Sequence, residues 1–443
     1  MLRIVTQRAE AEQELRRLAS RTHSDQVIHK ESTVREILLN VKRSGDEALV
    51  RYTLEFDHVD LQQVGLTVSA EEKERAYEMI SAKLLKAIRL AHQRIEAFHR
   101  ERVPKSWVTH GPHGIVLGKK ITPVDVAGLY IPGGRASYPS TVLMNAVPAK
   151  VAGVPRIVMV TPPSANSSSL GNESINPAVL VAAQETGIQE IYRVGGAQAI
   201  GALAYGTQTI PKVDVITGPG NIYVTLAKKL VYGEVGIDSL AGPSEVLVIA
   251  DHTANPLWVA TDLLAQAEHD PLASAILLTP SETVAHQVVI EVEKLLKTHE
   301  RRVLTEKSIA NYGLVVITSD LEEATELSNL FAPEHLELEV EDPWALLPKI
   351  RHAGAVFLGH HTPEAIGDYL AGPNHTLPTS GAARHSSALG VETFMKSTSL
   401  IHYSPEALAE VAEAIDELTW AEGLPSHGDS VRFRLGDTEK NSG

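Results

Sequence analysis

The stretch from Asp262 to Asp270 combines metal-binding side chains with residues that favour a helix. Gln266 and His269 stand three residues apart, so on a helix they would share one face. An amide oxygen and an imidazole nitrogen are half of a metal site, and Glu268 and Asp270 could orient them from a second layer. The alternative is an amphipathic helix with a polar pair on its surface, and only partners elsewhere in the chain can decide between the two.

Four further stretches place hydroxyl, carboxylate and imidazole groups where apolar packing would be expected. They are Leu240–Glu245, Ala332–Leu336, Ile366–His375 and Glu422–His427. Each of them, taken alone, is also compatible with a structural turn or a solvated ion pair. The side chains are nevertheless of the types that serve acid–base catalysis and metal binding.

Known nucleotide and hydrolase motifs are absent from the sequence. It has no Gly-x-Gly-x-x-Gly fingerprint, no Walker A motif, no Gly-x-Ser-x-Gly elbow and no His-Glu-x-x-His. Two Gly-rich turns, 194–198 and 217–221, could still offer backbone N–H groups to phosphates at helix N-termini.

Short apolar runs, Gly-rich turns and helical segments alternate through the middle of the chain. Strands are expected at 124–131, 156–161, 191–194, 213–216, 245–250, 275–278 and 313–318. Repeated strand–turn–helix units indicate parallel α/β sheets with right-handed crossovers. A helix is expected over 142–151, with a kink or break at Pro148. Two series of units suggest two lobes, with ligands at the carboxyl ends of the strands.

The two ends of the chain have helical patterns. Residues 9–99 read as charged amphipathic helices that form an arm or a packing layer, and residues 405–420 read as a further helix. The second helix could pack on its own chain or reach a partner.

Composition excludes several classes of protein. The 443 residues are 43% hydrophobic and 21% charged, which is ordinary for a globular protein. A formal net charge of -15 disfavours nucleic acid as a partner. Because cysteine is absent, disulfides, a thiolate nucleophile and a Cys-ligated zinc are excluded. The first residues lack the apolar core of a signal peptide, and no run is long enough to span a membrane, so a cytoplasmic location is expected.

Taken together, these stretches resemble the histidinol dehydrogenase family. The motifs that carry the resemblance are VAGLYIPGGRASYPSTVLMNAVPAKVAGV from Val126, TGPGNIYVTLAKK from Thr217, DSLAGPSEVLVIAD from Asp238, DLLAQAEHD from Asp262, FAPEHLEL from Phe331 and GDYLAGPNHTLPTSGAARHSS from Gly367. The similarity runs from about Thr22 to about Arg434, so it covers nearly the whole chain.

The resemblance implies an α/β fold of two incomplete Rossmann-like parallel-sheet lobes, with helical N- and C-terminal segments that intertwine in a dimer. The expected division is a helical arm and packing segment at 1–105, a lobe contacting NAD at 106–235, a lobe carrying metal and catalytic residues at 236–380, and a C-terminal helical segment reaching the partner subunit at 381–443.

The resemblance also implies a reaction and a set of site residues. The reaction is the oxidation of L-histidinol through L-histidinal to L-histidine with two NAD, the last step of histidine biosynthesis, at one Zn²⁺ per subunit. The implied zinc ligands are Gln266, His269, Asp368 and His427, the last from the other subunit of a homodimer. The implied catalytic pair is Glu334 and His335. The substrate is contacted by the metal ligands, Asp368 among them, and by Ser244, His335, His375 and Glu422. The implied contacts to NAD are Tyr130, Gln198 and Asn221.

Elementary chemistry agrees with this assignment. Imidazole, carboxylate and amide donors suit zinc, and a site of this kind can orient a substrate that brings its own nitrogen donors. Without cysteine, the aldehyde cannot react through a thiohemiacetal, so the second oxidation must start from its hydrate. His335 is then the expected base in both steps, and Glu334 the group that activates water.

Three other readings remain open at this stage. A related zinc-dependent alcohol dehydrogenase could act on another small polar alcohol, although Glu422 and His375 argue for a substrate with an amine and an imidazole. A zinc hydrolase would leave Tyr130, Gln198 and Asn221 without a role. A binding protein with two α/β lobes would not need so many titratable groups in its loops.

Overall fold

The computed structural model describes residues 2–21, 25–133, 138–164 and 174–437. The chain divides into two compact units. Unit 1 comprises residues 1–102 and 124–394 and contains two parallel sheets, and unit 2 comprises residues 103–123 and 395–443. Gly134 and Arg135, in the loop that follows the strand expected at 124–131, lie outside the described residues.

The larger sheet of unit 1 has six parallel strands in the order β1-β11-β10-β9-β12-β13. Their bounds are β1 Arg3–Val5, β9 Glu245–Ala250, β10 Ser274–Thr279, β11 Gly313–Ile317, β12 His335–Glu339 and β13 Ala355–Leu358. All residues of β9 and β10 are buried, as expected for central strands of a sheet that is covered on both faces.

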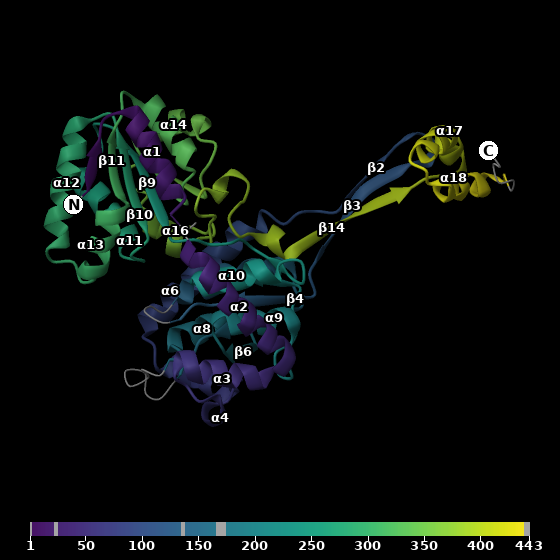
Figure 1. Cartoon of the computed structure of the whole chain (residues 1–443), viewed down its shortest axis with the longest axis horizontal. Coiled ribbons are helices and arrows are strands. Elements are labelled where there is room, and N and C mark those ends of the chain that lie inside the picture. Colours follow the sequence, from purple (N-terminus) through teal and green to yellow (C-terminus); the bar gives the residue numbers. More distant parts are fainter. Residues whose placement is uncertain (1, 22–24, 134–137, 165–173, 438–443) are drawn as a thin grey trace. The chain divides into compact units, whose positions relative to one another are not determined.

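Helices cover both faces of this sheet (Figure 1). Alternate residues of a strand point to opposite faces, so each strand contributes to two apolar layers. Val246 and Val248 pack in the layer formed with α11 Pro256–Ala267, α12 Glu282–Leu296 and α13 Arg302–Tyr312. Leu247 and Ile249 pack in the layer formed with α1 Arg8–Ala19 and α14 Leu321–Phe331. The short helices α15 Pro343–Leu346 and α16 Glu364–Tyr369 follow β12 and β13.

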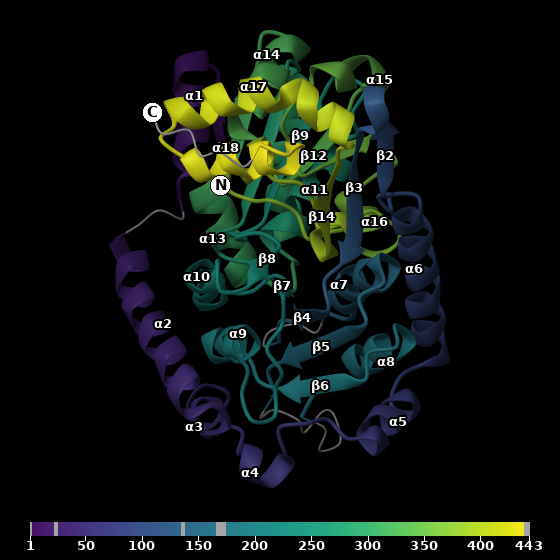
Figure 2. The ribbon, with the colours of Figure 1, turned by 90° about the vertical axis from the view of Figure 1, so that its right-hand side faces the viewer.

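The second sheet of unit 1 has five parallel strands in the order β6-β5-β4-β7-β8. Their bounds are β4 Val126–Tyr130, β5 Arg156–Thr161, β6 Glu190–Arg193, β7 Val215–Thr217 and β8 Gly236–Ile237. The helices that follow its strands are α7 Pro139–Ala152, α8 Pro177–Glu185, α9 Gly196–Tyr205 and α10 Ile222–Val231 (Figure 2). The chain thus forms a second α/β lobe in which strands and helices alternate as in the first.

The N-terminal helices cover the five-stranded sheet and its helices. They are α2 Asp25–Ser44, α3 Asp46–Asp57, α4 Leu61–Val64, α5 Ala70–Glu78 and α6 Ala82–Arg100. Helix α2 packs on α9 and α10, whereas α5 and α6 pack on α7 and α8. Ser69 begins α5 with a capping box to Glu72, which satisfies two backbone N–H groups at once.

Unit 2 is a three-stranded antiparallel sheet with two helices. The sheet has the order β14-β3-β2, with bounds β2 Trp107–His110, β3 Val116–Pro123 and β14 Met395–His402. The helices are α17 Pro405–Ala421 and α18 Pro425–Arg432, which pack on each other. In the described part of the chain, no helix combines the length and the apolar character that crossing a membrane requires.

The fold class expected from the sequence is confirmed. Each expected strand and helix of the two α/β series is present, with bounds that differ by a few residues. The sequence reading did not identify β1, which extends the six-stranded sheet from the N-terminal arm, nor β2, β3, β8, β12, β13 and β14. The break expected at Pro148 was wrong, because α7 continues through it.

Candidate active site

Strand β12 presents two different faces. Leu336 and Leu338 point into the apolar layer shared with α1 and α14. His335, Glu337 and Glu339, at alternate positions, must point to the opposite face. All five residues of the strand are buried. A row of titratable groups therefore starts at the first residue of the strand, where the expected catalytic pair Glu334 and His335 lies.

His335 has a defined tautomer. Its Nδ1 lies 3.0 Å from the backbone oxygen of Glu245, which can only accept, so Nδ1 carries the proton. Its Nε2 is buried and finds no hydrogen-bond partner in the described part of the chain, and it lies 4.0 Å from Asp368 Oδ1. Burial lowers the pKa of His335 to about 3. The ring is therefore neutral, with a free lone pair on Nε2 that can accept a proton from a bound molecule.

Glu334 is held by a reciprocal pair of hydrogen bonds. The Glu245 N–H donates to Glu334 Oε2 at 2.9 Å, and the Glu334 N–H donates to Glu245 Oε2 at 3.3 Å. Burial, and then the charge of Glu245, raises the pKa of Glu334 well above its usual value. A carboxylate with a raised pKa is a stronger base than one exposed to water.

The turn before β12 fixes where the pair stands. Helix α14 ends at Phe331, and Ala332 follows in the left-handed region with φ 57°. The N–H groups of Gly354 and Ala355 donate to the Pro333 and Glu334 carbonyls, both at 2.9 Å. A Cβ at Gly354 would lie 2.6 Å from the Glu334 carbonyl oxygen, so only glycine permits this approach.

His269, Glu364 and Asp368 form a compact group of possible metal ligands. One ligand atom from each lies within 4.8 Å of the others. Glu364 and Asp368 are four residues apart on α16, so they share one helix face. His269 lies beyond the end of α11 in a turn closed by its N–H on the Gln266 carbonyl at 3.2 Å. The expectation that Gln266 and His269 share a helix face was therefore wrong: a turn, and not the helix, presents His269.

Gln266 contacts this group through Glu364. In the orientation that satisfies both amide atoms, its nitrogen donates to Glu364 Oε2 at 2.7 Å and its oxygen accepts from the Glu245 N–H at 3.0 Å. Glu268 and Asp270, which were expected to orient the pair from a second layer, make contacts with other residues.

Other contacts occupy these two carboxylates. Glu268 faces His299 at 3.6 Å, and Asp270 accepts from the Leu272 N–H at 2.9 Å. The carboxylate against Gln266 belongs to Glu364, a residue that the sequence reading missed because no local spacing links it to Gln266.

The donor types fit a zinc ion. An imidazole, two carboxylates and an amide that can turn its oxygen inward are nitrogen and oxygen ligands, as zinc accepts in catalytic sites. Among the described residues a second acidic group, formed by Asp262, Glu337 and Glu339, lies further along β12. This second group has no imidazole among the three, so it is less suited to zinc than the first.

His375 reaches this region from a loop that Pro148 helps to hold. A proline has no N–H, so it leaves the carbonyl four residues earlier, that of Met144, without its helical partner. The Asn374 side chain donates to that carbonyl at 2.5 Å. Asn374 also accepts from the Thr376 N–H at 2.8 Å, so His375 stands between two fixed residues. Desolvation lowers the pKa of His375 to about 4.

The remaining expected substrate and metal residues lie in two places. Ser244 immediately precedes β9, and its carbonyl accepts from the Ser274 N–H at 3.0 Å. Glu422 and His427 belong to unit 2, at the end of α17 and in α18, and both are exposed in the single chain.

The expected NAD contacts lie around the five-stranded sheet. Gln198 on α9 is 1% exposed, yet both of its side-chain amide atoms lack a partner among the residues that the structure describes. Tyr130 ends β4, and its hydroxyl accepts from the Gly196 N–H at 3.2 Å. Asn221 caps α10, and its Oδ1 accepts from Tyr223 N at 3.0 Å. A buried amide without partners is costly unless a ligand satisfies it, so Gln198 is the strongest sign of a binding site here.

The Gly-rich turn before α10 is rigidly supported. A Cβ at Gly218 would lie 2.0 Å from the Tyr130 carbonyl oxygen, and its φ is +117°. Its N–H donates to Asp238 Oδ2 at 2.8 Å, and its carbonyl accepts from Lys228 Nζ at 3.0 Å. Lys228 and Asp238 also form a buried ion pair. The turn can therefore present backbone N–H groups without rearrangement.

The two sheets place their expected site residues at opposite strand ends. Tyr130, Gln198 and Asn221 lie at or after the carboxyl ends of β4, β6 and β7, as expected. Ser244 and His335 instead lie at the amino ends of β9 and β12, in or next to the turns that enter the sheet, and not at the carboxyl ends where ligands were expected.

Comparisons with known proteins identify the family. A family model described as histidinol dehydrogenase matches residues 19–435. A histidinol dehydrogenase of Gloeobacter violaceus is 70% identical over 435 residues, covering 98% of this chain and 96% of that protein. Histidinol dehydrogenase 2 of Trichormus variabilis is 67% identical over 439 residues, covering 99% and 100%.

A solved structure gives the same result. The crystal structure of histidinol dehydrogenase from Elizabethkingia anophelis is similar with a TM-score of 0.86 and 39% identity, covering 91% of this chain and 92% of that chain. The chain therefore belongs to the histidinol dehydrogenase family, and it is an oxidoreductase of histidine biosynthesis that acts on histidinol.

Proposed function

We propose that this enzyme oxidises L-histidinol to L-histidine through L-histidinal, with two NAD consumed in succession at one site. The observation that carries the proposal is the buried pair of Glu334 and His335, whose Nε2 is free and lies beside the group of His269, Glu364 and Asp368. The pair offers two bases of different kinds next to a place for a cation.

The first oxidation needs a base for the hydroxyl proton while hydride leaves to the nicotinamide. His335 Nε2 is suited to this, because the Glu245 carbonyl holds the proton on Nδ1 and so keeps the lone pair on Nε2. The low pKa of His335 shows how strongly burial disfavours the imidazolium. A nearby carboxylate, Asp368 at 4.0 Å, can stabilise that cation once it forms.

The second oxidation starts from an aldehyde, and the chain has no cysteine to capture it. A water must add to the aldehyde before the second hydride leaves. Glu334, whose pKa is raised, is the base we assign to this water. His335 then serves as base in both hydride transfers.

We assign the zinc ligands to Gln266, His269, Asp368 and, from the partner subunit, His427. When bound, zinc would orient the substrate through its imidazole and amine nitrogens and lower the cost of bringing them into a buried site. To bind zinc, the Gln266 amide would turn so that its oxygen, and not its nitrogen, lies on the side of Glu364. Ser244, His375 and Glu422 complete the substrate contacts, and Tyr130, Gln198 and Asn221 those to NAD.

The proposed homodimer is supported by the surface of unit 2. Ile401, Leu418 and Trp420 are 75%, 63% and 74% exposed in the single chain. Large apolar side chains at such exposure are typical of a surface that a partner covers. We therefore propose that unit 2 contacts a second copy, so that Glu422 and His427 serve the site of the other subunit, in a cytoplasmic enzyme.

The experiment that tests the function is NADH formation from limiting L-histidinol with excess NAD, before and after chelation. Two NADH per histidinol, lost on chelation and restored by zinc, is the expected result. One NADH per substrate would indicate a two-electron alcohol dehydrogenase and would remove Glu334 from its assigned task. No NADH from a zinc-loaded enzyme would point to a related dehydrogenase with another substrate.

A further inference from the structure

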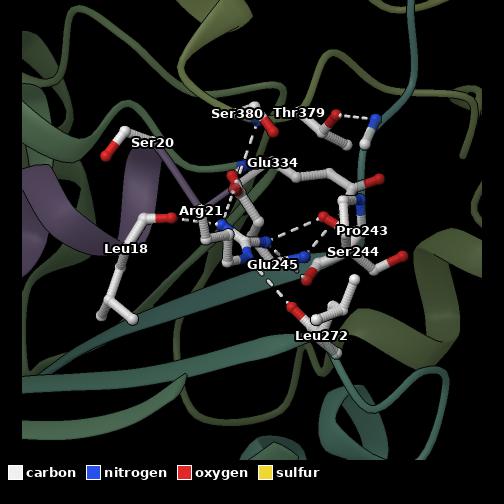
Figure 3. Close-up of polar contacts among 12 residues, drawn as sticks. Leu18, Ser20, Arg21, Pro243, Ser244, Glu245, Leu272, Glu334, Thr379 and Ser380 are labelled. Carbon is white, nitrogen blue, oxygen red and sulfur yellow. Dashed lines mark hydrogen bonds and ion pairs between the residues drawn. The ribbon is translucent and has the colours of Figure 1, made fainter. Parts of the chain in front are cut away.

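Arg21 lies just beyond helix α1, and its side chain is enclosed next to the catalytic pair (Figure 3). A guanidinium group has five N–H donors, and five acceptors face this one. Nε donates to the Leu272 carbonyl at 2.9 Å. Nη1 donates to the Leu18 carbonyl at 2.7 Å and to Glu245 Oε1 at 2.8 Å. Nη2 donates to the Pro243 carbonyl at 3.0 Å and to the Ser244 carbonyl at 3.5 Å. The arginine side chain is 2% exposed, so its hydrogen-bonding capacity is used entirely within the protein.

Glu245, the charged partner of Arg21, contacts both catalytic residues. Its buried carboxylate accepts from Arg21, from the Ser380 N–H at 3.2 Å and from the Glu334 N–H at 3.3 Å. Its own N–H donates to Glu334 Oε2 at 2.9 Å, and its carbonyl holds the Nδ1 proton of His335 at 3.0 Å. The backbone of one residue therefore sets the carboxylate position of Glu334 and the tautomer of His335, while its carboxylate, held by Arg21, fixes the Glu334 N–H.

The charges explain why Arg21 is needed here. Glu245 and Glu334 are buried and joined by reciprocal backbone-to-carboxylate hydrogen bonds, so their two carboxylates are near enough to repel when both ionise. Arg21 is the cation that pairs with Glu245 among the described residues. The charged and titratable groups that face Glu334 are Arg21 after α1, Glu245 on β9, His335 on β12, and Glu364 and Asp368 on α16.

We propose that Arg21 and Glu245 form a positioning pair for the reaction: the arginine holds the Glu245 carboxylate, and Glu245 in turn orients Glu334 and His335. Neither residue needs to touch the substrate. The inference rests on the catalytic roles proposed for Glu334 and His335. It adds that the N-terminal arm, through Arg21, determines the geometry and the charge at the catalytic pair.

The alternative is that Arg21 only stabilises the fold. Arg193 provides a matched control for this alternative. Arg193 is also buried and ion-paired, with Glu72, and it also donates to backbone carbonyls, including that of Thr67 at 2.7 Å. Arg193→Lys should therefore lower stability as Arg21→Lys does. If Arg21→Lys lowers kcat and Arg193→Lys does not, the loss reflects the positioning of Glu334 and His335 and not a loss of stability.

The test compares Arg21→Lys, Arg21→Gln, Glu245→Gln and the double variant Arg21→Gln/Glu245→Gln in the zinc-loaded full-length enzyme. Thermal unfolding, kcat and KM for L-histidinol, and the pH dependence of kcat for histidinol and for histidinal are measured. We expect Arg21→Lys to lower kcat by about 10- to 100-fold, because lysine cannot reproduce the planar fork, with KM changed by less than about threefold.

The pH profiles discriminate most sharply. Loss of the Arg21 cation should move the acidic limb of the histidinal reaction to higher pH, because the carboxylate of Glu334 then becomes harder to ionise. Glu245→Gln should move the limb to lower pH, because a negative neighbour is removed. The double variant should lie between the two. Arg193→Lys should leave the profile where it is.

Two results would overturn the inference. The first is an acidic limb that stays in place in every soluble variant while only the unfolding temperature falls. The second is a shift in the same direction for both single substitutions. If wild-type enzyme itself produced no NADH from histidinol, the proposed function would have failed and not the positioning pair, so the wild-type stoichiometry is measured first.

Discussion

At the scale of single residues, the site depends on groups that are held by backbone atoms. His335 keeps Nε2 free because a carbonyl holds Nδ1, and Glu334 keeps its orientation because an N–H holds Oε2. Backbone partners cannot change protonation state. The two catalytic side chains are therefore oriented in the same way whether they carry a proton or not, which suits groups that must take up and release protons in each cycle.

The division of work between these two residues can be tested by Glu334→Gln. Glutamine keeps the shape and can still accept from the Glu245 N–H, but it cannot take a proton from water. We expect oxidation of histidinal to slow by about 100-fold or more, and oxidation of histidinol to slow far less. Each half-reaction is followed by NADH formation from its own substrate. Equal slowing of both would show that the two roles are not divided in this way.

Several of these residues could be predicted from the sequence, and others could not. Glu334, His335, Gln266 and His269 stand out because they lie in short polar motifs. Arg21 could not be recognised, since its partner Glu245 lies 224 residues away and an isolated arginine after a helix has no distinctive pattern. Contacts of this range become visible only when the sheet brings the loops together.

At the scale of elements, buried strands with uniform apolar character were predicted well, for example β5 and β9. Strand β12 was not identified, although its sequence, His-Leu-Glu-Leu-Glu, alternates apolar and charged residues as a half-exposed strand does. In the structure both of its faces are buried. The functional site explains the difference, because a catalytic strand must place polar groups in the interior.

The second acidic group, formed by Asp262 of α11 with Glu337 and Glu339 of β12, leads to a prediction about stability. Burial, followed by the charge of Glu339, raises the pKa of Asp262 to about 7. The folded state therefore binds more protons than the unfolded chain between about pH 4 and pH 7, and the stability contributed by this group falls as the pH rises through that window.

Asp262→Asn removes the charge. We expect the variant to be more stable than wild type at pH 8 by on the order of 1 kcal/mol, with little difference at pH 4. Urea unfolding at both pH values measures this. Glu300→Gln, at an exposed position, serves as the control and should show no such dependence. Equal effects at both pH values would mean that Asp262 does not ionise across this range.

At the scale of the whole molecule, the expected site residues are divided between two units. Gln266, His269 and Asp368 belong to unit 1, whereas Glu422 and His427 belong to unit 2. A sequence can show that such residues exist, but it does not show which copy of the chain uses them. That question concerns the assembly, and only an experiment with two distinguishable chains answers it directly.

Mixed dimers provide that experiment. His335→Asn and His427→Asn are each expected to be inactive. If each site takes His427 from the other chain, a mixed dimer carries one site with both defects and one intact site. The purified mixed dimer should then show about half of the wild-type activity, because one of its two sites is intact. Differently tagged chains are co-expressed and the mixed species is purified before assay. Persistent inactivity of verified mixed dimers would count against a shared site.

The two faces of β12 also connect folding to catalysis. A slip of one residue in the pairing of β12 with β9 would exchange its faces, so that three titratable side chains would enter the leucine-packed layer while two leucines replaced them at the site. A molecule with this slip would bury unpaired charged groups in an apolar layer and would also lack His335 at the site. Specific activity after refolding should therefore report the fraction of correctly paired molecules, and quality control in the cell would discard the same molecules that fail as catalysts.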